Sequence, residues 1–517
     1  MTDKLLLSID CGTQSLRAMI FNTDGDLLAI ARKDYTPYQS PQPGWAEQDP
    51  EVYWESLVQT CRILKEQHPL LFEKIYGIGV TTQRASMINV DKQGKPLRNA
   101  ILWLDQRRFK PGTLLPPWFK GALTLTPLAK KVMDIHAQGK CNWLRLNEPE
   151  LWKTTHKYLQ VSGFLNHRLT QVFADSTASQ IGHLPFDYKK QAWAGPMKLT
   201  RILFPVEPDK LPRLINPGGV IGTVTAKAAE QTGLCEGLEV IACGSDKGCE
   251  TLGAGVMDDT MISLSFGTTA TVQTTCDRYF EPIPHMPPYP APVPGCYNPE
   301  VEIFRGFWMI TWFKNEFAHL EAQEARQRGI STEEVLNRCL ERTSPGAMGL
   351  MVQPYWSPGL DLPHAKGAII GFGDIHTRDH VYRAVIEGLG FALYEGMEKI
   401  KKKGRLSIKR AAVSGGASQS REICQIAADI FDIPMVKGKT HETSGLGAAM
   451  LTAAGVGLFS GIPRAVEQMS SQQTVFEPDP DHSRIYRSLY DKVYSNMYRA
   501  LGPLYTHIQT ITGYPST

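Results

Sequence analysis

The 517-residue sequence predicts an α/β protein with two halves of similar size. The first observation is a strand-turn-strand-turn-strand pattern at the start of the chain, which predicts a β-meander. The second is an echo of that pattern, because the apolar run Met261–Phe266 leads into Gly267-Thr268, 255 residues (267 − 12) after Gly12-Thr13. The third is helical periodicity after each set of strands. An internal repeat of this kind predicts two domains, residues 1–254 and 255–517.

The first half opens with three predicted strands, Leu5–Asp10, Leu16–Phe21 and Leu27–Ala31. Asp24-Gly25, between the last two, is typical of a type I′ hairpin turn, in which both central residues have positive φ. Asp49-Pro50 indicates a helix start, and apolar side chains follow at helical spacing over about 17 residues.

Beyond this helix the pattern returns to strands. Ile75–Thr81 and Ser86–Val90 are predicted strands around the polar group Thr82-Gln83-Arg84, and a hairpin-type turn follows at Asp91–Gly94. Residues 111–193 are expected to be mainly helical and to form an insertion or lid.

In the second half, predicted strands flank the second Gly-Thr turn at Met261–Phe266 and Ala270–Thr275. Glu281–Gly295 is rich in proline, and we interpret it as a stiff surface connector rather than a polyproline ligand. The later elements are predicted as a helix at Gly388–Lys403, a strand at Leu406–Ser414, a helix from Ile423 to Ile430 ended by Pro434, and a buried helix in Leu446–Phe459.

Composition and charge exclude several classes of protein. Hydrophobic residues at 42% and charged residues at 21% are typical of a folded chain. A net charge of +3 is too weak for the electrostatic footprint of a nucleic-acid binder. The ten cysteines include no CxxC pair, which indicates reduced thiols, and no apolar run reaches the ~18 residues of a membrane span. We therefore expect a cytoplasmic protein with neither a nucleic-acid nor a membrane partner.

Two Gly-Thr turns at strand ends are candidate phosphate sites. Glycine allows close approach of the backbone, successive N–H groups form an anion-binding concavity, and the threonine hydroxyl adds a donor. Asp10 precedes Gly12 by two residues, and Ser265 precedes Gly267 by two residues. Each turn alone also fits an ordinary β-turn with a capping threonine, whereas the pair favours phosphate binding.

Two further turns follow predicted strands. Ser414–Ser418 has the sequence SGGAS, which suits two interpretations. It is either a turn that contacts a flat ring or a phosphate at a helix start, or a tight turn that serves packing. It lacks the spacing of dinucleotide-binding and P-loop motifs. Gly244-Ser245-Asp246 puts a carboxylate at the end of an apolar strand. Such a carboxylate is either structural or, in a cleft, able to accept the proton of a substrate hydroxyl, as phosphoryl transfer requires.

Together these motifs resemble the FGGY family of carbohydrate kinases, which includes glycerol kinase and xylulokinase. The resemblance covers nearly the whole chain and is carried by Ile9–Arg17, Gln83-Arg84, Trp103–Arg107, Gly244–Asp246, Phe266–Thr269, Ser414–Ser418, Pro354–Trp356, Gly367–Gly371 and Glu387–Ala392. It implies an α/β fold of two actin-like, ribonuclease H-type domains with an interdomain cleft. It also implies ATP between the domains and a sugar held mainly by the first domain.

The resemblance implies a role for each matching residue. Asp246 would be the general base and, with Asp10, would hold Mg²⁺. The residues implied to contact ATP are Gly12, Thr13, Gln14, Gly267 and Thr268 at the phosphates and Gly415, Gly416 and Ala417 at the adenine. The residues implied to contact the sugar are Gln83, Arg84, Trp103, Asp105 and Asp175. The implied cofactors are ATP and Mg²⁺, and a homodimer is one assembly compatible with the family.

The implied substrate is a small sugar or polyol, and a pentulose is favoured. Trp103-Leu104-Asp105 is similar to the pentulose kinases, although Gln83-Arg84-Ala85 replaces the Gln-Met-His group of xylulokinase. In glycerol kinase a glutamate follows the arginine, and its loss here removes an acceptor for glycerol. Activity on glycerol or another polyol, and a non-catalytic sugar sensor on the same fold, are the alternatives.

Two sequence features leave a choice of interpretation. Lys247 either pairs with Asp246 and lowers its pKa or points into solvent, and we favour the second. His376 and His380 are four residues apart, as in a zinc helix, but the HExxH glutamate is missing. We therefore favour a solvated helix start over a metal hydrolase.

Overall fold

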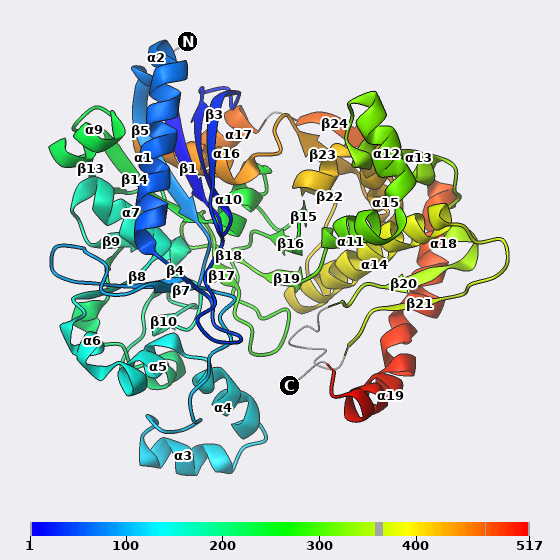
Figure 1. Ribbon diagram of the computed structural model, residues 1–517, viewed down its shortest axis with the longest axis horizontal. Coiled ribbons are helices and arrows are strands. Elements are labelled where there is room, and N and C mark those ends of the chain that lie inside the picture. Colours follow the sequence, from blue (N-terminus) through cyan, green and yellow to red (C-terminus); the bar gives the residue numbers. More distant parts are fainter. Residues whose placement is uncertain (1–2, 357–364, 471, 515–517) are drawn as a thin grey trace. The chain divides into compact units, whose positions relative to one another are not determined.

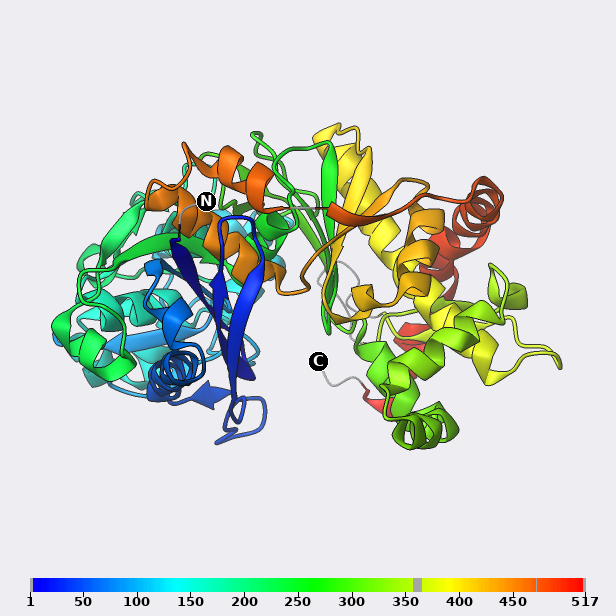
Figure 2. The same ribbon diagram turned by 90° about the horizontal axis from the view of Figure 1, so that it is seen from above.

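The apolar runs predicted as strands form two six-stranded sheets, one in each half of the protein (Figures 1 and 2). The computed structural model describes residues 3–356, 365–470 and 472–514. Its chain divides into two units: unit 1 is Met1–Gly253, Tyr289–Tyr297 and Thr443–Ser471, and unit 2 is Ala254–Pro288, Asn298–Glu442 and Gln472–Thr517. The first change of unit falls between Gly253 and Ala254. Two later segments return to unit 1, which a single boundary does not describe.

The sheet of unit 1 has the strand order β13-β14-β5-β1-β2-β3. Its strands are β1 (Leu5–Cys11), β2 (Ser15–Phe21), β3 (Leu27–Asp34), β5 (Ile75–Thr82), β13 (Val220–Thr223) and β14 (Glu239–Ser245). The first three pair antiparallel and confirm the predicted meander, whereas β5 runs parallel to both β1 and β14.

The hairpin between β2 and β3 forms as expected, but with a different turn. Gly25 has a φ of 79°, whereas Asp24 is not among the residues with positive φ, so the type I′ prediction is wrong. The Asn22 side chain replaces it by accepting hydrogen bonds from the backbone N–H groups of Asp24 at 3.0 Å and Asp26 at 2.8 Å. A side-chain acceptor of this kind offers the backbone an alternative turn geometry.

Both faces of this sheet are buried, because the strands place successive side chains on opposite faces and each face is covered by a helix. Leu7 and Ile9 of β1 share an apolar core with Leu57 of α1 (Pro50–Gln67). On the other face, the Ser8 hydroxyl donates to the Gly445 carbonyl of α16 (Thr443–Gly455) at 2.8 Å. Because successive side chains of a strand point to opposite faces, α1 and α16 cover opposite sides of the sheet (Figure 2). Both helices were predicted, including the N-cap at Asp49, which accepts from the Glu51 N–H.

The sheet of unit 2 has the order β19-β16-β15-β22-β23-β24 and repeats the pairing pattern of unit 1. Its strands are β15 (Met261–Phe266), β16 (Ala270–Thr274), β19 (Glu300–Ile303), β22 (Arg410–Ser414), β23 (Met435–Gly438) and β24 (Gln472–Phe476). Three antiparallel strands are again followed by two parallel strands and an antiparallel edge strand. The predicted internal repeat is therefore confirmed, and α14 (Arg378–Gly404) and α15 (Arg421–Phe431) contribute to the core of this unit.

Smaller elements complete the two units (Figure 1). The further helices are α2 (Pro69–Phe72), α3 (Pro117–Thr124), α4 (Ala129–Ala137), α5 (Lys140–Asn147), α6 (Pro149–Thr154), α7 (Val161–Thr170), α8 (Leu199–Leu203), α9 (Ala226–Thr232), α10 (Asp246–Gly253), α11 (Trp308–Phe317), α12 (His319–Arg328), α13 (Thr332–Glu341), α17 (Ile462–Met469), α18 (Pro480–Leu489) and α19 (Ser495–Thr512). The further strands are β4 (Glu47–Gln48), β6 (Met87–Val90), β7 (Ala100–Ile101), β8 (Lys157–Gln160), β9 (Ala174–Ser176), β10 (Phe186–Asp187), β11 (Ala192–Trp193), β12 (Arg213–Ile215), β17 (Tyr289–Pro290), β18 (Tyr297–Asn298), β20 (Met351–Gln353) and β21 (Ala368–Ile370).

Other sequence-based expectations have mixed outcomes. All ten cysteines are free thiols, and His380 accepts from the Thr377 N–H at the start of α14, as a capping residue does. The surface connector predicted at Glu281–Gly295 is wrong in part, because Pro290, Ala291 and Pro292 are buried. Across the residues that the structure describes, no helix is both long and apolar enough to cross a membrane.

Candidate functional site

Several candidate residues of unit 1 lie just beyond the carboxyl ends of three neighbouring strands. Gly12 and Thr13 come after β1, Gln83 and Arg84 after β5, and Asp246 after β14. These three strands are parallel and adjacent, so their carboxyl ends meet at one edge of the sheet. Such an edge is where open α/β sheets bind ligands.

The first Gly-Thr turn is held by side chains from other elements. The Gly12 carbonyl accepts from the Tyr35 hydroxyl at 2.6 Å and from Gln83 Nε2 at 3.2 Å. The Thr13 hydroxyl donates to Gln83 Oε1 at 3.2 Å. Gln83 is buried, so its amide fixes the turn, and Gln14 beside it is exposed.

Trp103 and Arg84 present surface next to this turn. The Trp103 indole N–H donates to Thr13 Oγ1 at 3.0 Å, yet 44% of the residue is exposed. Arg84 is half-buried, and its guanidinium lies over the Tyr289 ring at 4.8 Å from the ring centroid. An exposed ring and a cation at the edge of a sheet suit a hydroxyl-rich ligand.

Asp105 and Asp175 differ from the other predicted sugar contacts. Asp105 Oδ1 accepts from the N–H and Nε of Arg107, while Oδ2 accepts from Arg107 at 2.8 Å and from the Ala46 N–H at 2.6 Å. Asp175 is fully buried and accepts from three side chains and the Ser176 N–H. Burial raises the pKa of Asp175 to about 6. Because these acceptors are already occupied, the contacts support a structural role in place of the expected direct contact with a sugar.

Asp246 is the first residue of α10 and is half-buried. Burial raises its pKa above the usual range, although Arg84 and Lys247 oppose the increase. Lys247 does not point into solvent as predicted, because its ammonium forms an ion pair with Glu250 at 2.7 Å. A partly accessible carboxylate with a raised pKa is the type of group that accepts protons near neutral pH.

Asp10 supplies a second carboxylate to this edge. It is buried and forms an ion pair with Arg17 at 2.5 Å. The carboxylates of Asp10 and Asp246 both contribute to the raised pKa of Cys11 and of Cys249, each about 12 and mainly due to burial, so both lie near these thiols. Mg²⁺ is often bound through one or two carboxylates plus substrate phosphates, which fits this pair. Across the described parts of the chain, no group of three or more metal-ligating side chains is present.

The predicted nucleotide residues of unit 2 pack on one another. Gly415 has a φ of 82°, and a Cβ there would lie 2.9 Å from the Phe266 carbonyl carbon and 3.1 Å from the Gly267 nitrogen. The turn after β22 is thus seated against the turn after β15, as the packing-turn interpretation expects. At Gly416 a Cβ would meet no described atom within 4 Å, and Thr268 is exposed, so these two positions face open space.

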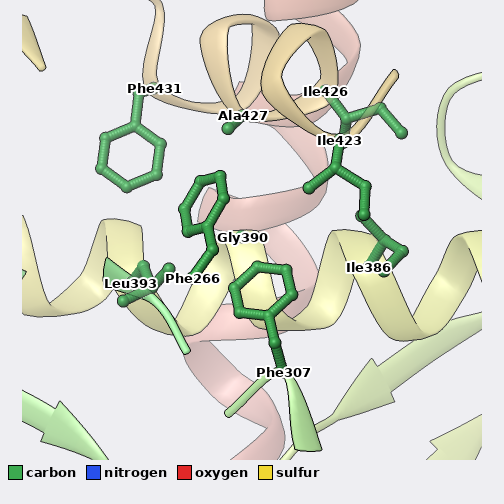
Figure 3. A pocket seen from close by; sticks show the side chains of 9 residues that line it. All are labelled: Phe266, Phe307, Ile386, Gly390, Leu393, Ile423, Ile426, Ala427 and Phe431. Carbon is green, nitrogen blue, oxygen red and sulfur yellow. The ribbon is translucent and has the colours of Figure 1, made fainter. Parts of the chain in front are cut away.

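A small apolar cavity lies in the core of unit 2, between α14 and α15 (Figure 3). It is lined by Phe266, Phe307, Ile386, Gly390, Leu393, Ile423, Ile426, Ala427 and Phe431. Its volume of about 10 Å³ is near the least that holds one water, and its lining carries almost no polar surface. We interpret it as a packing void of the core.

Two residues of the unit 1 site were missed by sequence reasoning. Lys140 of α5 is buried and donates to the Ala85 carbonyl at 2.5 Å, and burial lowers its pKa to about 7. Tyr289, which contacts Arg84, lies 205 residues (289 − 84) further along the chain. Neither pairing leaves a periodic signal in the sequence, because each depends on the tertiary fold.

Comparisons with known proteins agree over almost the full length. Residues 5–253 match the N-terminal domain of the FGGY family of carbohydrate kinases, and residues 262–456 match its C-terminal domain. The chain is 27% identical to xylulose kinase of Bacillus subtilis, covering 98% of this chain and 99% of that protein. It is 24% identical to gluconokinase of the same organism, covering 97% of each.

Solved structures show the same fold. Xylulose kinase from Rhodospirillum rubrum superposes with a TM-score of 0.83 at 24% identity, covering 97% of this chain and all of that one. Gluconate kinase from Lactobacillus acidophilus superposes with a TM-score of 0.82 at 22% identity, covering 98% of this chain and 99% of that one. The expected fold of two actin-like α/β domains is confirmed. The chain belongs to the FGGY family of carbohydrate kinases, enzymes that transfer a phosphoryl group to an alcohol group of a sugar.

Proposed function

We propose that this protein phosphorylates a hydroxyl of a small sugar, a pentulose, with ATP as the donor and Asp246 as the general base. The observation that carries the proposal is the Asp246 carboxylate, which is half-buried and has a raised pKa. It comes directly after β14, at the same sheet edge as the first Gly-Thr turn and Arg84.

Asp246 accepts the proton of the sugar hydroxyl while the oxygen of that hydroxyl bonds to the γ-phosphorus of ATP. The bond between this phosphorus and the bridging oxygen breaks, and ADP leaves with that oxygen. The exposed indole of Trp103 and the guanidinium of Arg84 orient the sugar. When bound at Asp10 and Asp246, Mg²⁺ would neutralise charge on the phosphates.

ATP is proposed to contact glycine-rich turns in both units. Gly12, Thr13 and Gln14 would meet the phosphates from unit 1, and Gly267 and Thr268 from unit 2. The open space beside Gly416 supports contact of Gly415, Gly416 and Ala417 with the adenine, because a bare backbone allows a flat ring to approach closely.

The proposed substrate class rests on the residues around Arg84. Ala85 cannot accept a hydrogen bond through its side chain, and the carboxylates of Asp105 and Asp175 are occupied by internal donors. Ala85 stands where glycerol kinase has a glutamate, so the site lacks that acceptor and should bind glycerol poorly. A relative named xylulose kinase supports a pentulose as the proposed substrate. A relative named gluconokinase makes an aldonate the second substrate to test.

The test is a coupled assay of ADP release with Mg-ATP and a panel of xylulose, ribulose, gluconate, glycerol and erythritol. We expect a pentulose to raise the rate well above the background without sugar. A higher rate with gluconate or glycerol would contradict the pentulose assignment. No response to any sugar, with ATP binding intact by calorimetry, would favour the non-catalytic sensor instead.

A further inference from the structure

The segment Tyr289–Tyr297 comes from the second half of the sequence but belongs to unit 1. Two hydrogen bonds attach it there: the Tyr297 hydroxyl donates to the Lys189 carbonyl at 2.7 Å, and Gln191 Nε2 donates to the Cys296 carbonyl at 2.7 Å. Within the segment, the Ala291 N–H donates to the Cys296 carbonyl at 3.0 Å. The segment is therefore a fixed part of unit 1.

Pro292, near the middle of this segment, packs against the loop that carries Asp246. A Cβ at Gly244 would lie 2.9 Å from Pro292 Cγ, and a Cβ at Gly248 would lie 3.1 Å from the same ring. These glycines flank Ser245 and Asp246, so the proline ring occupies the space that side chains would take. Pro292 thus supports the backbone from which the Asp246 carboxylate projects.

Tyr289, the first residue of the segment, faces Arg84. The Tyr289 ring lies under the Arg84 guanidinium at 4.8 Å, and its own centroid is 6.3 Å from that of Tyr188. Tyr188 is fixed because its hydroxyl bonds to both the N–H and the carbonyl of Gly182 at 3.1 Å. A guanidinium over an aromatic face is held by attraction to the ring, and its orientation is limited by the plane of that ring.

The segment therefore contacts both sides of the proposed sugar site, the Arg84 turn and the Asp246 loop. We propose that Tyr289 is a positioning residue of this site, whose ring fixes the Arg84 guanidinium in the orientation that binds the sugar, and that segment 289–297 forms one wall of the site. This inference rests on the proposed function, because it assigns Arg84 to sugar binding. It adds a residue that none of the sequence motifs contains.

The test compares Tyr289→Leu, which removes the ring, with Tyr289→Phe, which keeps it. We expect Tyr289→Leu to raise the KM for the sugar about tenfold, with kcat and the KM for ATP changed less than about twofold, because loss of orientation weakens binding in the ground and transition states alike. Tyr289→Phe should retain the wild-type KM. Tyr76→Leu is the matched control, since it removes a tyrosine under Lys4 at 3.5 Å, near the opposite end of β5.

A double-mutant cycle tests whether Tyr289 acts through Arg84. In an Arg84→Ala background, Tyr289→Leu should raise the KM for the sugar less than about twofold further. An unchanged KM in Tyr289→Leu with wild-type stability, or the same tenfold rise without Arg84, would overturn the inference while leaving the kinase assignment in place. If the wild-type protein phosphorylates no sugar of the panel, the proposed function fails, and this inference fails with it.

Discussion

The two units share one pattern of strand pairing but differ in the residues at the carboxyl ends of their central strands. In unit 1 the strands lead to Asp10, Arg84 and Asp246, which all carry charge. At the corresponding positions of unit 2, Ser265 stands near the end of β15, Gly415 and Gly416 come after β22, and Lys439 follows β23. The repeat thus supplies two equivalent sheet edges, and at these positions the carboxylates proposed for proton transfer and metal binding stand in unit 1.

The packing of the two edges fits the proposed division of roles, in which unit 1 supplies side chains and unit 2 supplies backbone. In unit 1, side chains from several elements converge on the edge, with Arg17 on Asp10 and Gln83 on the first Gly-Thr turn. In unit 2, the backbone of Gly415 packs directly on the backbone of Phe266 and Gly267. A general base requires a side chain, whereas binding phosphate and adenine through the backbone requires that side chains be absent.

Among variants that compare the two units, the largest expected difference is between Asp10→Asn and Ser265→Ala, which change equivalent positions. Asp10→Asn should lower kcat about 10²-fold and raise the Mg²⁺ concentration needed for activity, because it removes one of the two proposed carboxylate ligands. Ser265→Ala should change kcat less than about threefold, since its hydroxyl is not proposed to act in catalysis. The coupled assay over a Mg²⁺ titration measures both. Equal losses in the two variants would contradict the division between the units.

A smaller difference is expected between Gly415→Ala and Gly416→Ala within unit 2. Gly415→Ala should lower the free energy of unfolding by about 1–3 kcal/mol, because φ is 82° and the new methyl would overlap the backbone of β15. Gly416→Ala should stay within about 0.5 kcal/mol of wild type yet raise the KM for ATP several-fold. Urea unfolding and ATP kinetics separate the two effects. Wild-type stability of Gly415→Ala would show that the packing contact is wrong.

The last predicted difference concerns the pH dependence of stability that the buried Lys140 gives to unit 1. Its pKa is about 7 in the folded state and 10.5 when exposed, so between these values the unfolded chain binds more protons. The stability of the wild type should therefore rise with pH across this range, by at most about 1.4 kcal/mol per pH unit. Lys140→Met should lack this contribution.

Urea unfolding at pH 7 and pH 9 measures the difference between these slopes. Lys437→Met in unit 2, where the ammonium lies 3.5 Å from the Gln419 carbonyl, is the control and should keep the wild-type slope. Identical slopes for the wild type and Lys140→Met would mean that the lysine is not buried as described.

The fold was largely predictable because its signals are local. Apolar runs separated by turn residues identified β1 to β3, and a similar run before Gly267 identified the repeat. Asp49-Pro50 marked the start of α1, since capping depends on neighbouring residues. The type I′ turn failed because the Asn22 side chain offered a different turn, which the Asp-Gly pair does not reveal.

The candidate site was predictable only at the level of motifs. Asp105 was expected to face a sugar, but its partners are Arg107 and the Ala46 backbone, 59 residues away. Tyr289 lies in a proline-rich stretch interpreted as a surface connector, and its contact with Arg84 depends on the return of that segment to unit 1. Side-chain pairings over such separations leave no periodic trace, so a motif names a residue without its partners.

The central claim, that unit 1 supplies the catalytic base through Asp246, is tested most directly by comparing Asp246→Asn with the wild type on the best sugar of the panel. We predict that sugar-dependent ADP formation falls about 10³-fold, because the amide keeps the shape of the side chain but cannot accept the proton. ATP affinity measured by calorimetry in the absence of Mg²⁺ should stay within about twofold of wild type, because Asp246 is proposed to contact the metal and the sugar hydroxyl and not ATP itself. Sugar-dependent activity close to that of the wild type would contradict the claim.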